Sequence, residues 1–185
     1  MASLNRAKSL PSIIVAMTTL FAAPAFADSI RTIAVIGFDY SDSSGEPADQ
    51  AKEHMARLAL FREEIRNRVD RDASFKTIEL PCTERSRCSR GSTSADLLLR
   101  EARAAGAHFL VFGSIHKMST LVGAGRVDVL DVATDRILLD RVLSFRGDTD
   151  EAFKRAAAFA AKDILRTLNA NSGEDGMADD GRGAR

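Results

Sequence analysis

The sequence predicts a single α/β domain in which a mixed β-sheet of about five strands is covered by three helices. Two observations predict this fold class. Apolar runs of strand length alternate with segments whose apolar residues recur at helical spacing. Long connections separate the first three strands, as crossovers require, whereas the last three strands follow one another closely. The predicted order of elements is therefore β-α-β-α-β-β-β-α.

Composition narrows the classes of function. Hydrophobic residues make up 45% of the chain, which is enough for a packed core. Basic and acidic residues are equal in number, at 26 each, so the chain lacks the positive field with which proteins hold nucleic-acid phosphates. We therefore expect a soluble globular protein that binds no nucleic acid.

Residues 1–27 have the pattern of a secretory signal peptide. Basic residues come first, a mostly apolar run follows over residues 10–23, and Ala25-Phe26-Ala27 fits the small-residue cleavage rule. The apolar run is shorter than the roughly 20 residues that cross a bilayer. We expect cleavage after Ala27, a periplasmic location, and no membrane-spanning segment in the mature chain.

The first half of the domain predicts two strands and one helix. Residues 30–38 are almost continuously apolar, as in a strand buried on both faces. Turn-forming residues fill positions 39–49, and helical spacing of apolar residues then predicts an amphipathic helix ending near Arg71. Residues 75–80 alternate between apolar and polar and predict a second strand, which Pro81 ends.

The second half begins with a helix and three strands. The helix is expected to be capped by Thr93 and to run through Ala105. Residues 107–115 form another apolar run of strand length. Residues 126–132 and 136–145 then predict a hairpin, because only a short turn separates them.

A last helix and a tail complete the chain. Asp148 is expected to cap this helix, whose apolar stripe ends at Leu168. Gly, Asp and Asn dominate residues 169–185, which predicts a disordered tail. The single domain is therefore expected to span residues 28–168.

The two cysteines lie in residues 81–92, which are expected to be irregular. An even number of cysteines in an oxidising compartment favours a disulfide between Cys82 and Cys88. A redox dithiol and a metal site are the alternatives. The spacing is not Cys-x-x-Cys, and two thiolates are too few for zinc. A structural disulfide is the leading interpretation.

Basic side chains near this disulfide suggest a surface for a partner. Arg85 and Arg87 lie between the cysteines, and guanidinium groups bind carboxylate or phosphate in a bidentate manner. The alternative is a solvated loop balanced by nearby glutamates. His116 and Lys117 follow the third strand, and Arg146 follows the last one. These five residues are the predicted interaction residues.

The three histidines bear on the enzyme hypothesis. His54 is expected on the polar face of the first helix and His108 beside buried neighbours. His116 is the best candidate for a general base, because α/β sheets place sites at strand ends. No Gly-x-Ser-x-Gly or His-Glu-x-x-His pattern accompanies it, and residues 39–49 miss the spacing of a calcium loop. We therefore predict no catalytic residue, no metal and no cofactor.

Three stretches resemble a known group of α/β domains. Residues 33–39 (Ile-Ala-Val-Ile-Gly-Phe-Asp), 105–115 and 129–138 look like parts of the TolB amino-terminal domain and of its relatives among curli-secretion and penicillin-binding-protein-activator lipoproteins. His108 stands where that group usually has Asp. Residues 33–164 as a whole are similar to a family of exported bacterial proteins of unknown function.

The resemblance implies a non-enzymatic periplasmic accessory or adaptor protein. Its partner, a periplasmic protein, is expected to contact an edge strand or the loops 39–49, 81–92 and 116–125, by strand addition or loop docking. The glycine-rich residues 121–125 are either a flexible joint or an ordinary wide turn.

Two other functions stay open. The first is a small-molecule or metal-ion binder that supports quinoprotein-type oxidation, with a pocket near Asp39, His116 and Arg146. The second is a small hydrolase or a thiol redox protein, centred on His116 or on the cysteine pair.

Overall fold

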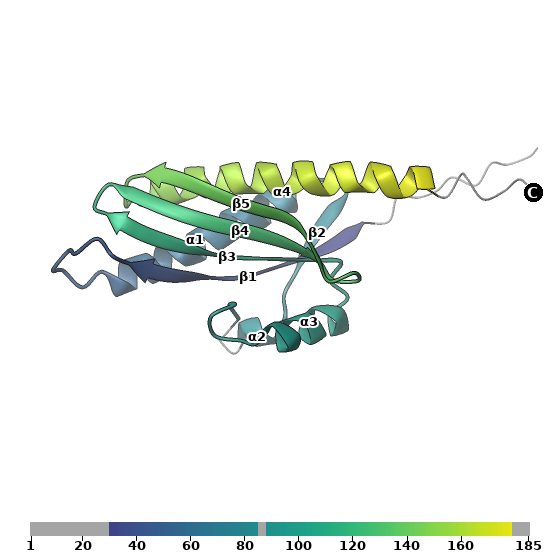
Figure 1. Cartoon of the computed structure of the whole chain (residues 1–185), viewed down its shortest axis with the longest axis horizontal. Coiled ribbons are helices and arrows are strands. Elements are labelled where there is room, and N and C mark those ends of the chain that lie inside the picture. The colour runs from purple at the N-terminus through teal and green to yellow at the C-terminus, as the bar shows by residue number, and fades with distance from the viewer. Residues whose placement is uncertain (1–29, 85–87, 179–185) are drawn as a thin grey trace, which may run out of the picture.

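A computed structural model describes residues 30–84 and 88–178, and in them the chain forms three layers (Figure 1). The expected signal peptide, Arg85 and Arg87 lie outside the described residues. The elements are β1 (Arg31–Asp42), α1 (Ala51–Val69), β2 (Phe75–Ile78), α2 (Pro81–Glu84), α3 (Ala95–Ala104), β3 (Phe109–Ser119), β4 (Val122–Asp131), β5 (Arg136–Arg146) and α4 (Asp150–Ala178).

The predicted mixed sheet of five strands is confirmed. Its strand order is β2-β1-β3-β4-β5. β1 runs parallel to β2 and to β3, whereas β4 is antiparallel to both of its neighbours. The parallel pairs follow from the long helical connections, and the antiparallel pairs follow from the two short turns.

Helices cover the two faces of the sheet unequally. α1 and α4 pack side by side against one face, and α2 and α3 lie against the other (Figure 1). Ile33 and Val35 join the larger core under α1 and α4, while Ala34 and Ile36 join the smaller core under α2 and α3. Successive side chains of a strand point to opposite faces, so an apolar run such as residues 33–36 marks a strand buried on both sides.

The face that carries α2 and α3 is only partly covered. The end of the sheet near the β3–β4 turn has no helix on this side (Figure 1). Exposed apolar residues on this side are Met118 of β3, Leu121 of the β3–β4 turn and Val142 of β5. An antiparallel sheet tolerates one solvated face, which accounts for this arrangement in the part of the sheet that β3, β4 and β5 form.

Some predicted boundaries are wrong. β1 continues to Asp42, because the turn-forming residues from 39 onward still pair with β3. Residues 122–125 belong to β4, so the glycine-rich segment is neither a joint nor a wide turn, and only Thr120 and Leu121 separate β3 from β4. Pro81–Glu84 forms the one-turn helix α2 inside the segment expected to be irregular.

The predicted helix caps are each displaced by one residue. Ser94, not Thr93, caps α3, because its side chain accepts from the N–H of Leu97. Thr149, not Asp148, caps α4, because its Oγ1 accepts from the N–H of Ala152 at 3.2 Å. Asp148 is thereby free to make the contacts described below.

The last helix is longer than its apolar stripe. α4 continues to Ala178, ten residues past the predicted end of the helix at Leu168. Each residue added to an existing helix gains a backbone hydrogen bond without needing a packed face. Residues 179–185 lie outside the described residues.

Candidate functional site

β1 has a stretch without a strand neighbour on one side. β2 pairs with β1 only as far as Ala34, which lies opposite Ile78. Beyond this point β1 pairs with β3 alone among the described strands. On the open side, Arg62 Nε donates to the Val35 carbonyl and the Gly37 N–H donates to the Cys88 carbonyl, each at 2.7 Å. On this side, the edge of β1 from Phe38 onward is therefore paired with no other described strand.

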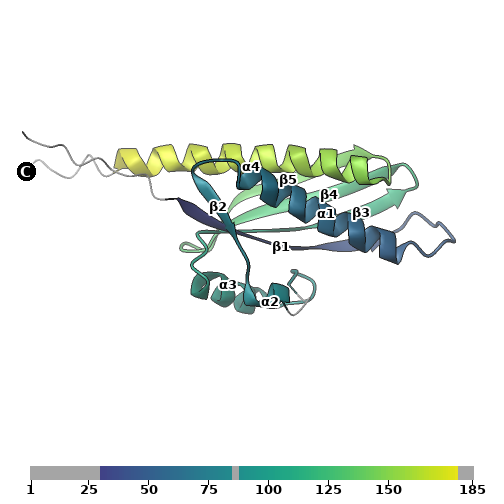
Figure 2. The same cartoon turned by 180° about the vertical axis from the view of Figure 1, so that it is seen from behind.

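A groove runs along this edge. A hollow of about 570 Å³ is lined by Gly37, Phe38, Asp39, Tyr40, Asp42, Ala48, Asp49, Gln50, Ala51, His54, Met55, Leu58, Cys88, Ser89 and Ser92. A second hollow of about 270 Å³ shares its lining at Gly37, Phe38, Met55, Leu58 and Cys88. We call the two together the β1 groove. Its walls are α1 with the residues before it and segment 88–92, and Figure 2 shows α1 and α2 on opposite sides of β1.

The wall at residues 88–92 is fixed by the disulfide and by Asp39. Cys82 and Cys88 form the predicted disulfide, with 5.0 Å between their Cα atoms, and both residues are buried. Asp39 Oδ1 accepts from Ser89 Oγ at 2.6 Å, and its Oδ2 accepts from the N–H of Gly91 at 2.8 Å. The disulfide thus ties the wall to α2, and the Asp39 carboxylate ties it to β1.

The opposite wall is held by Lys117. Lys117 Nζ donates to Glu46 Oε2 and to Gln50 Oε1, each at 2.6 Å, and lies 2.9 Å from Asp148 Oδ2. These bonds anchor residues 43–50 to β3. Lys117 is only 4% exposed, and its contact with a partner stays a prediction.

Asp148 joins this cluster to α1. Its Oδ2 also lies 3.1 Å from His54 Nε2, and its Oδ1 accepts from Arg57 Nη1 at 2.6 Å. Burial opposes charge on Asp148, but hydrogen bonds from Lys117 and His54 outweigh it and hold the pKa of the carboxyl below its ordinary value. Burial likewise opposes charge on Lys117, whose pKa is nevertheless raised by its bonds to Glu46 and Asp148. Both groups are therefore charged at neutral pH.

His54 is a site residue that the sequence reading placed wrongly. It is 3% exposed, not solvated, and its ring stacks on Tyr40 with 4.5 Å between the ring centroids. The missed signal is its spacing. His54 lies four residues before Leu58 on the stripe that continues through Phe61 and Ile65, so helical periodicity assigns it to the buried face.

Tyr40 gives the groove its own spectroscopic probe, because it is the only tyrosine in a chain without tryptophan. Burial, and then the nearby charges of Asp42 and Asp148, raise its pKa from 10.0 to about 12. We expect tyrosinate absorbance of the folded protein, followed by rapid mixing into alkali, to reach its midpoint near pH 12. The denatured protein is expected to titrate near its ordinary 10.0.

The sign of the linked stability change follows from this difference. A folded-state pKa above the unfolded value means that the stabilisation is complete below pH 10.0 and is lost as the pH rises towards 12. A native midpoint near 10 would contradict the packing of Tyr40 described here.

His116 lies outside the groove. Its Nδ1 is 2.8 Å from Ser41 Oγ and its Nε2 is 2.9 Å from Ser43 Oγ. A hydroxyl thus stands where a serine hydrolase has the carboxylate that orients its histidine. Neither His116 nor Ser43 lines the β1 groove.

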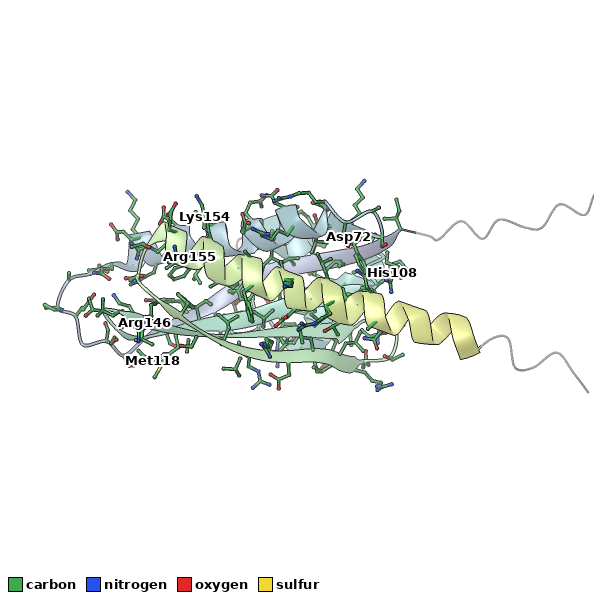
Figure 3. The ribbon with its side chains drawn as sticks, turned by 90° about the horizontal axis from the view of Figure 1, so that it is seen from above. Asp72, His108, Met118, Arg146, Lys154 and Arg155 are labelled. Atoms are coloured by element: carbon green, nitrogen blue, oxygen red, sulfur yellow. A yellow bond between two sulfur atoms is a disulfide. The ribbon has the colours of Figure 1, made fainter. Side chains whose placement is uncertain are left out.

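The remaining predicted site residues are not brought together. Arg146 is exposed at the end of β5 opposite Val122, at the same end of the molecule as Met118 (Figure 3). β3 and β4 lie between Arg146 and β1, so the expected pocket of Asp39, His116 and Arg146 does not form. The anion site at Arg85 and Arg87 stays a prediction.

A second cavity lies on the α3 side of the sheet. It measures about 500 Å³ and has Leu110, Phe112 and Leu130 among its lining residues. The guanidinium of Arg90 lies 5.9 Å from the ring centre of Phe112. Burial raises the pKa of Asp128, which also lines this cavity, against the lowering effect of Arg126.

The described residues provide neither a metal site nor a membrane span. No three His, Cys, Asp or Glu side chains among them are placed to hold a metal ion. Within the same ranges, no helix has the length and apolar character needed to cross a membrane.

Comparison with protein families gives one match over most of the chain. The family model described as "Protein of unknown function (DUF2380)" matches residues 31–165. The chain belongs to this family. The predicted membership of a family without an assigned function is thus confirmed. No curated protein sequence matches the chain.

Several solved structures resemble this family member in fold. TolB from Acinetobacter baumannii is 15% identical, with a TM-score of 0.48 over 77% of this chain, which spans only 29% of TolB. The LpoB C-terminal domain from Salmonella enterica is 13% identical over 62% of this chain and 82% of that one, with a TM-score of 0.39. The PelC dodecamer from Paraburkholderia phytofirmans is 12% identical over 73% and 86%, with a TM-score of 0.46.

Proposed function

We propose that the protein is a secreted periplasmic adaptor whose β1 groove binds an extended segment of a partner protein by strand addition. The observation that carries this proposal is the edge of β1 beyond Ala34, which pairs with no described strand on the groove side. An added strand gains main-chain hydrogen bonds from such an edge, and pockets beside it select alternate side chains.

The shape of the groove supports an extended occupant. Its floor follows β1 from Gly37 to Asp42, and its two walls are held by separate anchors, the disulfide on one side and Lys117 on the other. Met55 is 65% exposed above buried Leu58 and Phe38, so an apolar contact is available beside the edge. Rigid walls lower the entropy cost of binding, because little has to be ordered.

The chemistry of the groove favours binding over catalysis. His54 lines it, but the Nε2 of His54 bonds to Asp148 and no hydroxyl or thiol of the described residues is hydrogen-bonded to its ring. A general base needs a substrate proton or a nucleophile within reach. The cysteines are joined in a buried disulfide. Location in the periplasm is part of the proposal and is supported by the signal-peptide pattern of residues 1–27.

The proposal is tested by blocking the groove. Met55→Arg places a charged, longer side chain in the lining of both hollows. We expect the tagged variant, incubated with an envelope extract of the source bacterium, to lose capture of at least one protein by about tenfold or more, as for a central contact residue. Quantitative mass spectrometry measures this loss.

Met118→Arg is the matched control. Met118 is a second exposed methionine, and it lies on the uncovered face of the sheet and not in the groove. Both substitutions are at surface positions, so both variants are expected to stay within about 0.5 kcal/mol of the parent in stability. Equal capture by the parent and both variants would place the partner surface elsewhere.

A further inference from the structure

We infer that the segment bound in the β1 groove carries a basic side chain near the Asp42 end and an apolar side chain near Met55. This inference rests on the proposed function, and it adds the chemistry of the partner. Three observations carry it: the sign of the charges that line the groove, the absence of a cation partner for two of them among the described residues, and the position of the apolar surface.

The charged lining of the larger hollow is acidic. Of the described residues, Asp39, Asp42 and Asp49 line it and no lysine or arginine does. Arg62 lines the smaller hollow, where it donates to the Val35 carbonyl and to Glu79. Lys117, a buried cation behind the wall, is engaged by Glu46, Gln50 and Asp148. A segment that enters the larger hollow therefore meets carboxylates with no cation of the described residues in front of them.

Two of these carboxylates can accept further hydrogen bonds. Both oxygens of Asp39 are occupied by Ser89 and Gly91, whereas Asp42 and Asp49 are exposed. Asp42 Oδ1 accepts from the N–H two residues ahead at 2.7 Å, and Asp49 Oδ1 does the same at 3.0 Å. Neither carboxylate forms an ion pair within the described ranges, and a carboxylate accepts about four hydrogen bonds. Both can therefore accept an ammonium or guanidinium group.

The apolar surface lies further back along the strand. Met55 and Leu58 line both hollows together with Phe38, and Met55 is largely exposed. Methionine adapts to side chains of different shape because it is unbranched and polarizable. Phe38 and Asp42 are four residues apart, which is about 13 Å in a strand. The basic and apolar side chains of the partner are thus expected about four residues apart.

The experiment selects the segment from random sequences. A displayed library of random dodecapeptides is panned against the full chain without residues 1–27 and is depleted on the Met55→Arg variant. Peptides that need the groove are then synthesised with a fluorescent label, and their affinity is measured by anisotropy. We expect Lys or Arg to be enriched about four positions from an apolar residue.

Charge removal supplies the decisive comparison. In Asp42→Asn/Asp49→Asn each amide keeps the oxygen that accepts the local N–H but loses the charge. We expect the selected peptides to bind about three to ten times more weakly to this variant, as for two exposed ion pairs, and with less dependence on salt. Asp72→Asn is the control, because Asp72 makes the same bond to the N–H of Ser74 and lies at the far end of the molecule from Met118 (Figure 3).

The outcomes separate the two proposals. Groove-dependent peptides that are neutral or acidic, or that bind the double variant as well as the parent, overturn the inference and leave strand addition standing. Selection of no peptide that depends on Met55 overturns both. Equal weakening by Asp72→Asn would mean that the effect is not specific to the groove, which also overturns the inference.

Discussion

Replacing Lys117 by methionine is expected to destabilise the fold by about 3 kcal/mol, because it leaves the partly buried carboxylates of Glu46 and Asp148 without their cation. Methionine keeps the length and apolar stem of lysine, so the packing against β3 changes little. Asp148 retains His54 and Arg57, which places the effect at the lower end of the usual range. Urea unfolding followed by circular dichroism measures the loss.

The pH dependence of this difference has a defined sign. The raised pKa of Lys117 means that its stabilisation is complete below the ordinary value of 10.5 and is lost only above it. The lowered pKa of Asp148 means that its stabilisation is present above 3.8 and is lost as the pH falls below that value. The difference between parent and variant is therefore expected to be constant between about pH 5 and pH 10 and to shrink outside this window.

Lys154→Met is the matched control for Lys117→Met. Lys154 is exposed on α4 (Figure 3), and its loss is expected to change the unfolding free energy by no more than about 0.5 kcal/mol. A comparably small effect of Lys117→Met would show that the cluster does not hold residues 43–50 in place.

Removing the disulfide by Cys82→Ala/Cys88→Ala is expected to lower the unfolding free energy by about 2 kcal/mol, as the chain-entropy relation gives for so short a loop. The Cys88 carbonyl then loses its fixed position on the Gly37 N–H, and one wall of the β1 groove loosens. Denaturant unfolding of the double variant measures the loss, with the reduced and alkylated parent as a second route to the same state.

Peptide binding adds a second measurement for the disulfide. Affinity for a groove-dependent peptide is expected to fall in the double variant, because the wall at residues 88–92 must be ordered again on binding. If the double variant unfolds at the same denaturant concentration as the parent, the disulfide does not stabilise the fold, and this prediction is contradicted.

Most of the secondary structure is readable from local patterns. The apolar run at residues 33–36 and the apolar stripe of α1 are each predicted by the spacing of apolar residues within one short segment. The disulfide is predicted by the oxidising compartment and the even number of cysteines. Strand boundaries were less accurate, because β1 continues through polar residues once β3 is available to pair with them.

The site was harder to predict because its members come from distant segments. Lys117 continues the alternation of Val111, Gly113 and Ile115 towards the buried face, a signal that the usual exposure of lysine hides. The sequence around Asp148 is that of a helix cap, and it gives no sign that the carboxylate binds Lys117. Only the fold brings these side chains to His54, and only the shortness of β2 reveals which edge of β1 stays open.

The recessed position of the open β1 edge has a consequence for self-association. An outer strand of a sheet pairs readily with the outer strand of another copy. β5, one of the two outer strands, carries the charged residues Arg136, Asp140 and Arg141, which discourage such pairing. The open part of β1 lies instead between α1 and segment 88–92, where the walls keep a second sheet at a distance. For the proposed strand addition, we expect a lone extended chain to reach this edge and a second sheet not to, so that the edge brings little of the usual aggregation hazard.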